Sequence, residues 1–145
     1  MARQTLVLDA SVGVKWFSGK DEDSLPQALA IRNRHVSGDI QILVPDLFFY
    51  EVANALVYKK HIPIGEIQSA LSSLFSIDLD AVAMNAELMV IAAELARKLK
   101  ITIYDACYAA VSRINNIPLV TANPRHQIHG LGCEVIPLEQ WGKRC

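Results

Sequence analysis

Three carboxylates stand beside apolar stretches from which a lone acid is normally excluded. Asp9 ends the run TLVLD, Glu51 lies inside DLFFYEVANAL, and Asp105 follows ITIY. A single carboxylate among apolar and aromatic side chains is costly unless it is paired or bound to a cation. Clustered carboxylates repel one another, and a divalent ion that prefers oxygen ligands, Mg²⁺ or Mn²⁺, relieves that repulsion. Because such an ion activates water for attack on a phosphodiester, the three acids point to metal-dependent phosphodiester hydrolysis.

Each of these acids also has a structural explanation. Asp9 and Asp105 each suit the cap of a following helix, a position that aspartate commonly fills. Glu51 has no cation beside it in the sequence, although a distant arginine could pair with it. Asn54 lies one turn further along the same helical face, where it would hold a neighbouring acid by a hydrogen bond or cover a polar rim.

Short apolar runs alternate with helical patterns along the chain. We expect strands at 5–9, 40–44, 117–122 and 133–138, an edge strand or loop at 76–81, and helices at 11–17, 25–36, 46–61, 67–75, 88–99 and 105–115. The helix at 46–61 is apolar on most sides and should be well buried. This alternation predicts one domain over residues 1–145, a three-layer α/β sandwich with a mostly parallel central sheet. Ligands bind at the carboxyl ends of such strands, so Asp9, Glu51, Asp105 and Asn123 should converge at one edge.

Composition and charge narrow the classes of protein. The formal net charge of −1 lacks the basic footprint of a nucleic-acid scaffold but is compatible with an enzyme that handles phosphates through a metal ion. Neither a signal-peptide layout nor an apolar run of membrane-spanning length is present in the sequence. Cys107, Cys133 and Cys145 are odd in number and widely spaced, unlike a disulfide framework or a zinc motif. We therefore expect a soluble cytoplasmic protein with reduced thiols.

Three stretches resemble the successive motifs of a known family. LVLDASVGVKWF, VPDLFFYEVANAL and YDACYAAVSRINNIPLVTAN, in this order, resemble the PIN-domain ribonucleases, and most of all the VapC-type toxins of toxin–antitoxin pairs. The resemblance implies an endoribonuclease dependent on Mg²⁺ or Mn²⁺, in which Asp9, Glu51 and Asp105 hold the metal and a bound water attacks the RNA. It also implies a homodimer that a cognate antitoxin inhibits, and it matches Thr121 to the family's hydroxyl.

The chain departs from the family at the fourth acidic position. Many relatives carry an acid two residues after the hydroxyl, where this chain has Asn123. Others carry Asn at that position and an acid three residues after it, where this chain has His126. Asn123 could offer its amide oxygen to a metal or a water, and His126 could donate to phosphate or ligate Mn²⁺. As a loop residue beside a proline, His126 is expected to be solvated. We expect one firm metal site, a weak or absent second one, and low activity.

Other readings remain open. The first alternative is a PIN domain with weak or no catalysis, kept for binding an antitoxin or RNA. Receiver domains and haloacid-dehalogenase-like phosphatases are disfavoured, because they need a second acid near Asp9, and Ser11 occupies the phosphatase position. Auxiliary site candidates are Ser11, Asn54, Thr121 and Asn123. Lys15, Arg113 and Arg125 are candidates for phosphate contacts, although solvated surface charge explains each of them equally simply.

Overall fold

The computed structural model describes residues 3–18, 22–126 and 129–143. The strands in this part of the chain are β1 (Gln4–Leu8), β2 (Ile40–Pro45), β3 (Asp80–Val82), β4 (Leu119–Thr121) and β5 (Val135–Pro137). All neighbouring strands pair in parallel, in the order β3-β2-β1-β4-β5. This arrangement confirms the prediction of a parallel central sheet.

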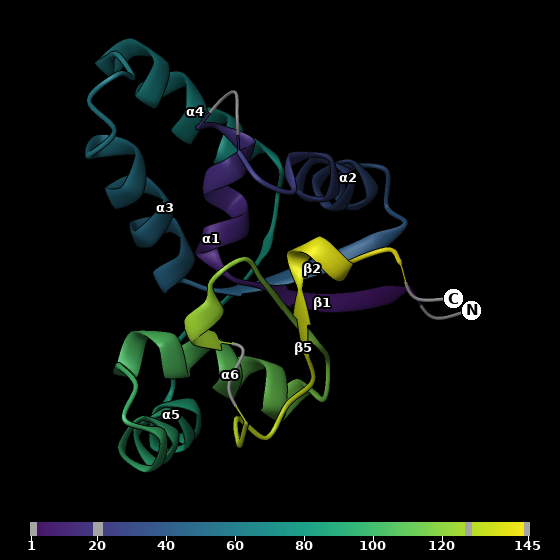
Figure 1. The fold of residues 1–145 in the computed structure, drawn as a ribbon, viewed down its shortest axis with the longest axis vertical. Coiled ribbons are helices and arrows are strands. Elements are labelled where there is room, and N and C mark those ends of the chain that lie inside the picture. Colours follow the sequence, from purple (N-terminus) through teal and green to yellow (C-terminus); the bar gives the residue numbers. More distant parts are fainter. Residues whose placement is uncertain (1–2, 19–21, 127–128, 144–145) are drawn as a thin grey trace.

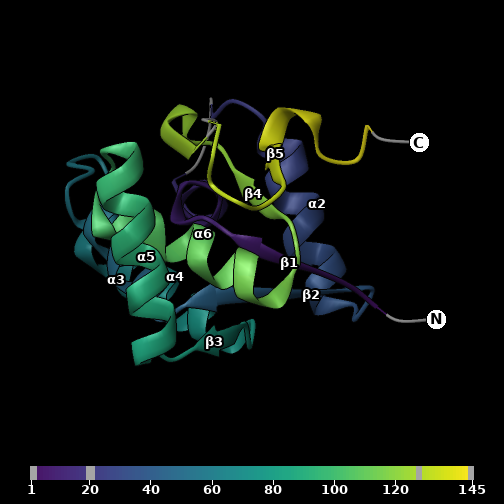
Figure 2. The same ribbon diagram turned by 90° about the horizontal axis from the view of Figure 1, so that it is seen from below.

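Helices cover both faces of the sheet. The α-helices of the described residues are α1 (Ala10–Gly13), α2 (Leu25–Val36), α3 (Leu47–Val57), α4 (Ile64–Ser76), α5 (Ala86–Leu99) and α6 (Ile103–Asn115), and the 3₁₀ turns are η1 (Val14–Trp16), η2 (Pro124–His126) and η3 (Leu138–Gln140). In Figure 1, α1 and α2 lie on one side of β1 and β2, and α5 and α6 lie on the other. Figure 2, in which the molecule is seen from below, shows α5 packed against α6. No helix in the described ranges is both long and apolar enough to span a bilayer.

The two central strands are apolar on both faces because both faces are covered by helices. Leu6, Val7 and Leu8 of β1 are fully buried, and Ile42 of β2 is buried opposite Leu6. Strands of a doubly covered parallel sheet are continuous apolar runs of this kind. The edge strand β3 is largely exposed and carries Asp80 at its start. The core therefore lies along β1, β2 and β4 and the helices that pack on them.

The order of the strands reverses beside β1. β2 and β3 lie on one side of β1, whereas β4 and β5 lie on the other. In open parallel sheets, ligands bind in the crevice outside the carboxyl ends of the strands at such a reversal. Here the backbone N–H of Asp9 donates to the carbonyl of Val120 at 3.0 Å, which joins the ends of β1 and β4. The residues just after these two strands therefore form the floor of the expected site.

The helix expected at 46–61 is shorter and more exposed than predicted. α3 ends at Val57, and a turn in which Ile62 donates to the carbonyl of Lys59 leads to Pro63 and α4. One face of α3 is buried, but Tyr50 and Tyr58 are each 76% exposed. The prediction of a well-buried helix was wrong because no described element covers the outer face of α3.

The run ITIY is not a strand, contrary to its apolar pattern. Ile103 and Tyr104 form the first turn of α6, and the hydroxyl of Thr102 accepts the N–H of Asp105 at 3.0 Å. Short apolar runs fit a strand and a buried helix turn equally well. The spacing Thr-x-x-Asp is a helix-capping pattern, and it would have identified this start.

Gly13 allows α1 to lie directly against α3. A Cβ atom added at Gly13 would stand 2.5 Å from Cζ of the fully buried Phe48 and 3.3 Å from Val52. We predict that Gly13→Ala lowers the free energy of unfolding by about 1–3 kcal/mol, since overpacking outweighs the better helix propensity of alanine. Chemical denaturation followed by circular dichroism measures this loss.

Gly65 in α4 is the matched control for this prediction. A Cβ atom there meets nothing within 4 Å, so Gly65→Ala should leave stability unchanged or slightly raised. Equal stability of the two variants would contradict the packing argument.

Candidate functional site

Asp9 is buried immediately after β1 and has three oriented donors on one oxygen. It is 4% exposed and caps α1, where its Oδ2 accepts the backbone N–H of Ser11 at 3.2 Å and a short hydrogen bond from the Ser11 hydroxyl. The hydroxyl of Thr121, at the end of β4, donates to the same oxygen at 3.2 Å. The N–H of Ala122 in turn donates to the Ser11 hydroxyl at 3.0 Å. Ser11 and Thr121, both auxiliary candidates, therefore orient Asp9.

Asp105 reaches the same place from α6. It is buried in the first turn of the helix, where the capping contact with Thr102 positions it. Its Oδ2 lies 4.0 Å from Nε of Arg125, and its Oδ1 faces a ring nitrogen of His126. The structure therefore brings the two aspartates together, with both carboxylates facing the same nitrogen, Nε2, of one imidazole.

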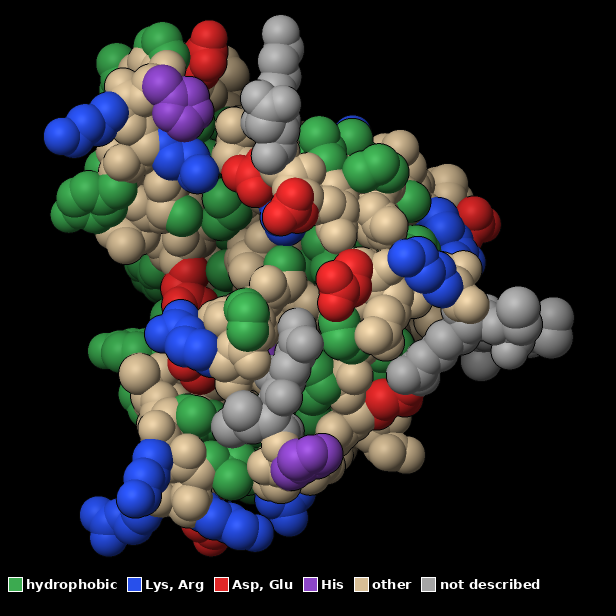
Figure 3. All heavy atoms as spheres, viewed as in Figure 1, with side chains coloured by type: hydrophobic (Ala, Val, Ile, Leu, Met, Phe, Trp, Pro, Cys, Tyr) green, Lys and Arg blue, Asp and Glu red, His purple; other side chains and the backbone are tan. Residues whose placement is uncertain are grey.

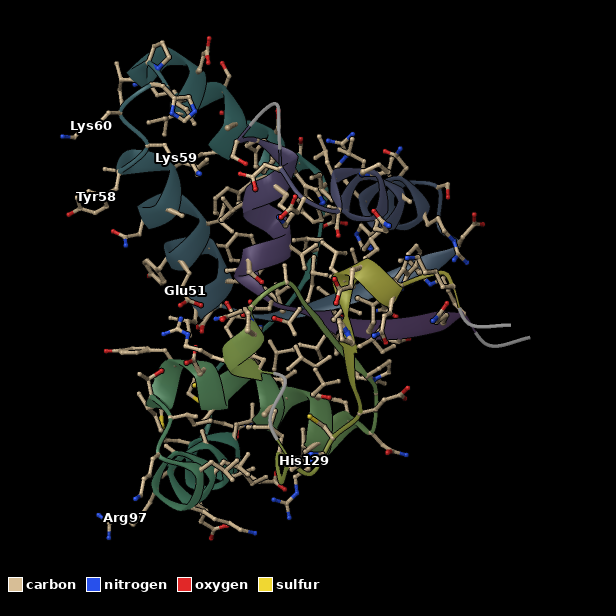
Figure 4. The ribbon with its side chains drawn as sticks, in the orientation of Figure 1. Glu51, Tyr58, Lys59, Lys60, Arg97 and His129 are labelled. Carbon is tan, nitrogen blue, oxygen red and sulfur yellow. The ribbon has the colours of Figure 1, made fainter. Side chains whose placement is uncertain are left out.

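Glu51 is the third acid, and its partner was not anticipated. It projects from α3 toward α6 (Figure 4), where the hydroxyl of Tyr108 donates to its Oε1 at 2.5 Å. Burial, with the negative charges of Asp9 and Asp105, raises the pKa of Glu51, while the hydrogen bond from Tyr108 works in the opposite direction. The three carboxylates therefore share one electrostatic environment. Tyr108 is three residues after Asp105, and this helical spacing was the available signal.

His126 lies in the middle of the site, not in solvent. It is 1% exposed, and its Nε2 lies 3.3 Å from Oδ1 of Asp9 and 3.5 Å from Oδ1 of Asp105. The ring of Tyr108 packs edge-on against it, with the ring centres 5.9 Å apart. The expectation of a solvated loop residue was wrong because the turn that precedes His126 directs its side chain inward.

Asn123 builds that turn and does not present its amide to the acids. Its Oδ1 accepts the backbone N–H of Arg125 at 3.0 Å and Nε of Arg125 at 3.4 Å, and its carbonyl accepts the N–H of His126 at 3.0 Å. In this structure the side chain of Asn123 therefore closes the turn, and its role as a metal or water ligand stays a prediction. Asn54 is exposed, and its side chain makes no hydrogen bond to any other described residue, so the structure does not bring it into the site.

Asp9 and His126 stabilise each other's charged form. Burial by itself would raise the pKa of Asp9, but contact with the positively charged imidazole, together with the bonds from Ser11, holds that pKa below its ordinary value of 3.8. Burial would lower the pKa of His126, yet the contact with Asp9 and the charge of Asp105 raise it above 6.5, against the opposing charge of Arg125. The imidazolium and the carboxylate therefore form an ion pair within the protein.

The oxygen donors of the site suit a hard divalent ion in chemistry, but they are not assembled into a complete ligand set. Asp9 and Asp105 supply carboxylate oxygens that face a common point, and Glu51 is the third acid. Within residues 3–18, 22–126 and 129–143, no group of three or more His, Cys, Asp or Glu side chains has the arrangement of a metal site. The Asp9–Asp105 pair is thus the part of the site that fits a metal ion, and His126 stands between its two members.

The predicted cations differ in their availability. Lys15 is nearly buried and pairs with Glu22 at 3.3 Å, so its charge is already engaged. Arg113 lies in the last turn of α6, against Gly132, whereas Asp105 lies in the first turn. Arg125 is 70% exposed beside Asp105. Figure 3 shows acidic and basic side chains side by side on this face, between the lobe of α3 and α4 and the lobe of α5 and α6. Arg125 is therefore the cation best placed to contact a phosphate near the acids.

The described thiols take no part in the site. Cys107 is buried and Cys133 is partly buried, and both are free, as expected for reduced thiols. Burial raises the pKa of Cys107, which keeps its sulfur protonated. Cys145 lies outside the described residues.

The fold and the site together define an α/β protein with buried carboxylates at the reversal point of a parallel sheet. The PIN domain family model matches residues 6–129, and the chain belongs to the PIN domain family. Proteins of this family are generally nucleases. A comparison with curated protein sequences gave no match.

Solved structures agree on the fold. VapBC2 from Rickettsia felis, bound to a DNA fragment from its promoter, is 19% identical with a TM-score of 0.67, covering 92% of this chain and 98% of that one. A toxin–antitoxin complex from Klebsiella pneumoniae is 19% identical with a TM-score of 0.66, covering 92% and 97%. PAE2754 from Pyrobaculum aerophilum is 21% identical with a TM-score of 0.67, covering 97% and 93%. At these identities, the likeness establishes the fold.

The ion pair of His126 with Asp9 predicts a pH-dependent contribution to stability. Because the pKa of His126 is raised in the folded protein, its contribution to the free energy of unfolding is fully present below pH 6.5. That contribution is lost as the pH rises through the pKa of the folded state. The lowered pKa of Asp9 makes its contribution full above pH 3.8 and lost as the pH falls through the lower folded value. With a chelator present, we expect His126→Gln to lower the melting temperature most at about pH 5 and least at about pH 9.

Differential scanning fluorimetry across this pH range measures the effect, and His129→Gln is the control because His129 is exposed. A melting-temperature difference between the native protein and His126→Gln that stayed constant from acid to alkaline pH would contradict the assigned charge of His126.

Proposed function

We propose that this protein is a metal-dependent endoribonuclease of the VapC toxin type that uses Mg²⁺ or Mn²⁺. One observation carries the proposal: carboxylates from two distant parts of the chain, Asp9 and Asp105, face one point at the reversal of the sheet. Glu51 completes a set of three acids in the electrostatic environment of that point. Membership of the PIN domain family supports the reaction class.

The residues of the site divide the work. Asp9 and Asp105 would hold the ion, which would supply an activated water and neutralise charge on the phosphodiester. Ser11 and Thr121 hold Asp9 in one orientation through hydrogen bonds to its Oδ2. Such oriented ligands are what a metal site needs to keep its geometry.

Glu51 is the carboxyl group best suited to exchange a proton. Its raised pKa brings it closer to neutral pH, where a general acid or base is most effective. Tyr108 orients it by donating to Oε1, and the exposed Arg125 beside Asp105 is placed to contact an RNA phosphate.

An antitoxin and a second copy of the chain are the proposed protein partners, in the cytoplasm. Large apolar side chains stand exposed on α3 and α4, among them Tyr50, Tyr58, Ile64 and Phe75. Contiguous exposed apolar surface marks protein–protein contacts. The solved structures of similar fold include toxin–antitoxin complexes, which supports an antitoxin as one occupant of such surfaces.

Cleavage of RNA by purified, antitoxin-free protein tests the enzyme. We expect cleavage with Mg²⁺ or Mn²⁺, none with a chelator, and a loss of about 10²-fold or more in Asp9→Asn and in Asp105→Asn. Asp39→Asn is the matched control, since Asp39 is exposed at the turn before β2. Chelator-resistant cleavage, or equal activity in all three variants, would contradict the proposed site.

A PIN domain that binds without cleaving is the second candidate function. The buried His126 favours it, because an imidazole stands where both carboxylates would meet a metal ion. In that case, the native protein stays silent in the cleavage assay with either metal while it still binds its antitoxin. The same assay thus separates the two functions.

A further inference from the structure

The point that Asp9 and Asp105 both face is already occupied by the imidazole of His126. Nε2 of His126 lies 3.3 Å from one carboxylate and 3.5 Å from the other, and the residue is almost fully buried. We infer that His126 is a built-in counter-ion, which holds the two aspartates together without metal and which a divalent ion must displace in order to bind them. The inference rests on the proposed function only in taking Asp9 and Asp105 as the metal-binding pair.

Contacts on two sides position the imidazole of His126. Asn123 fastens the turn η2 through three contacts, two accepted by its side chain and one by its carbonyl. Tyr108, which is anchored to Glu51, presents its ring edge to the imidazole. A histidine held on one side by a turn and on the other by a buried aromatic ring is placed by packing, and its position between the acids is a property of the fold.

Although packing sets its position, the imidazole of His126 is held less firmly than the carboxylate of Asp9. Among the described residues, neither nitrogen of its ring makes a hydrogen bond of good geometry, so charge and packing alone hold it. Asp9, in contrast, has three donors on Oδ2. An incoming ion would therefore displace the imidazole and leave the carboxylate of Asp9 in place.

The same contacts argue against His126 as a metal ligand. Asp9, Asp105 and His126 are not arranged as a three-residue metal site. Nε2 of His126 lies 3.3 Å from Asp9 and 3.5 Å from Asp105, in the place between the two carboxylates that the ion itself would take. The ligand role predicts that loss of His126 weakens metal binding, whereas the counter-ion role predicts that it strengthens metal binding.

Mn²⁺ binding to RNA-free protein, measured by electron paramagnetic resonance, separates these roles. We expect His126→Leu, which cannot ligate a metal and has a similar volume, to lower the Mn²⁺ dissociation constant about tenfold or more relative to the native protein. His126→Asp should lower it further, and the exposed control His129→Leu should leave it unchanged. An equal or weaker affinity in folded His126→Leu, or no Mn²⁺ binding by any variant, would overturn the inference.

A second measurement uses the native protein and does not depend on the folding of a variant. In a Mg²⁺ titration followed by ¹⁵N NMR of the histidine side chains, the ring signals of His126 should move toward those of the exposed His129 as the ion binds. Signals of His126 that remain at their metal-free positions at saturation would contradict displacement. Neither experiment contains RNA, so the inference and the nuclease proposal fail separately. Tighter metal binding by His126→Leu, in a protein that cleaves no RNA, would uphold the inference and contradict the nuclease proposal. A metal-ligating His126 in an active enzyme would contradict the inference and uphold the nuclease proposal.

Discussion

The buried pair of carboxylates formed by Asp9 and Asp105 is the constraint on which the rest of the site depends. Two like charges in a desolvated place raise each other's energy unless a cation lies between them. Donors from Ser11 and Thr121 fix the carboxylate of Asp9, and the first turn of α6 holds the backbone of Asp105 beside it. A positive charge at their common point therefore stabilises the folded chain, and His126 supplies it in the absence of metal.

Asp9 and Asp105 take part both in the capping of helices and in the candidate site. Asp9 caps α1 with the carboxylate that faces the cluster, and Asp105 donates its backbone N–H to the cap of α6 while its side chain points to the cluster. The strand reversal beside β1 brings both helix starts to one edge of the sheet. Tyr108 links the third acid to this arrangement from the next turn of α6. Local helix capping, which stabilises the fold, is thus also what aims the acids.

The sequence predicts the part of this structure that depends on local pattern and chain order. The apolar runs identify β1, β2 and β4, and the carboxyl end of β1 places Asp9 at the edge of the sheet where the site lies. Asp105 reaches the same edge from the first turn of α6, not from the end of a strand. The contact of Tyr108 with Glu51 spans 57 positions, so the helical spacing of Tyr108 from Asp105 marks the face of α6 but does not identify Glu51 as the partner. The burial of His126 depends on the path of a three-residue turn, and the exposed face of α3 depends on which helices happen to cover it. Contacts of this kind are tertiary, so residue type and spacing alone did not predict them.

The turn built by Asn123 makes the placement of the side chain at position 126 depend on the residue at position 123. The amide at position 123 fastens the backbone that carries the imidazole at position 126. An aspartate at 123 keeps an oxygen that can accept the N–H of Arg125, so this replacement would preserve the turn and add its charge to the turn, away from the cluster. A side chain at position 126 therefore reaches the point between Asp9 and Asp105 only while position 123 holds a side chain that closes the turn.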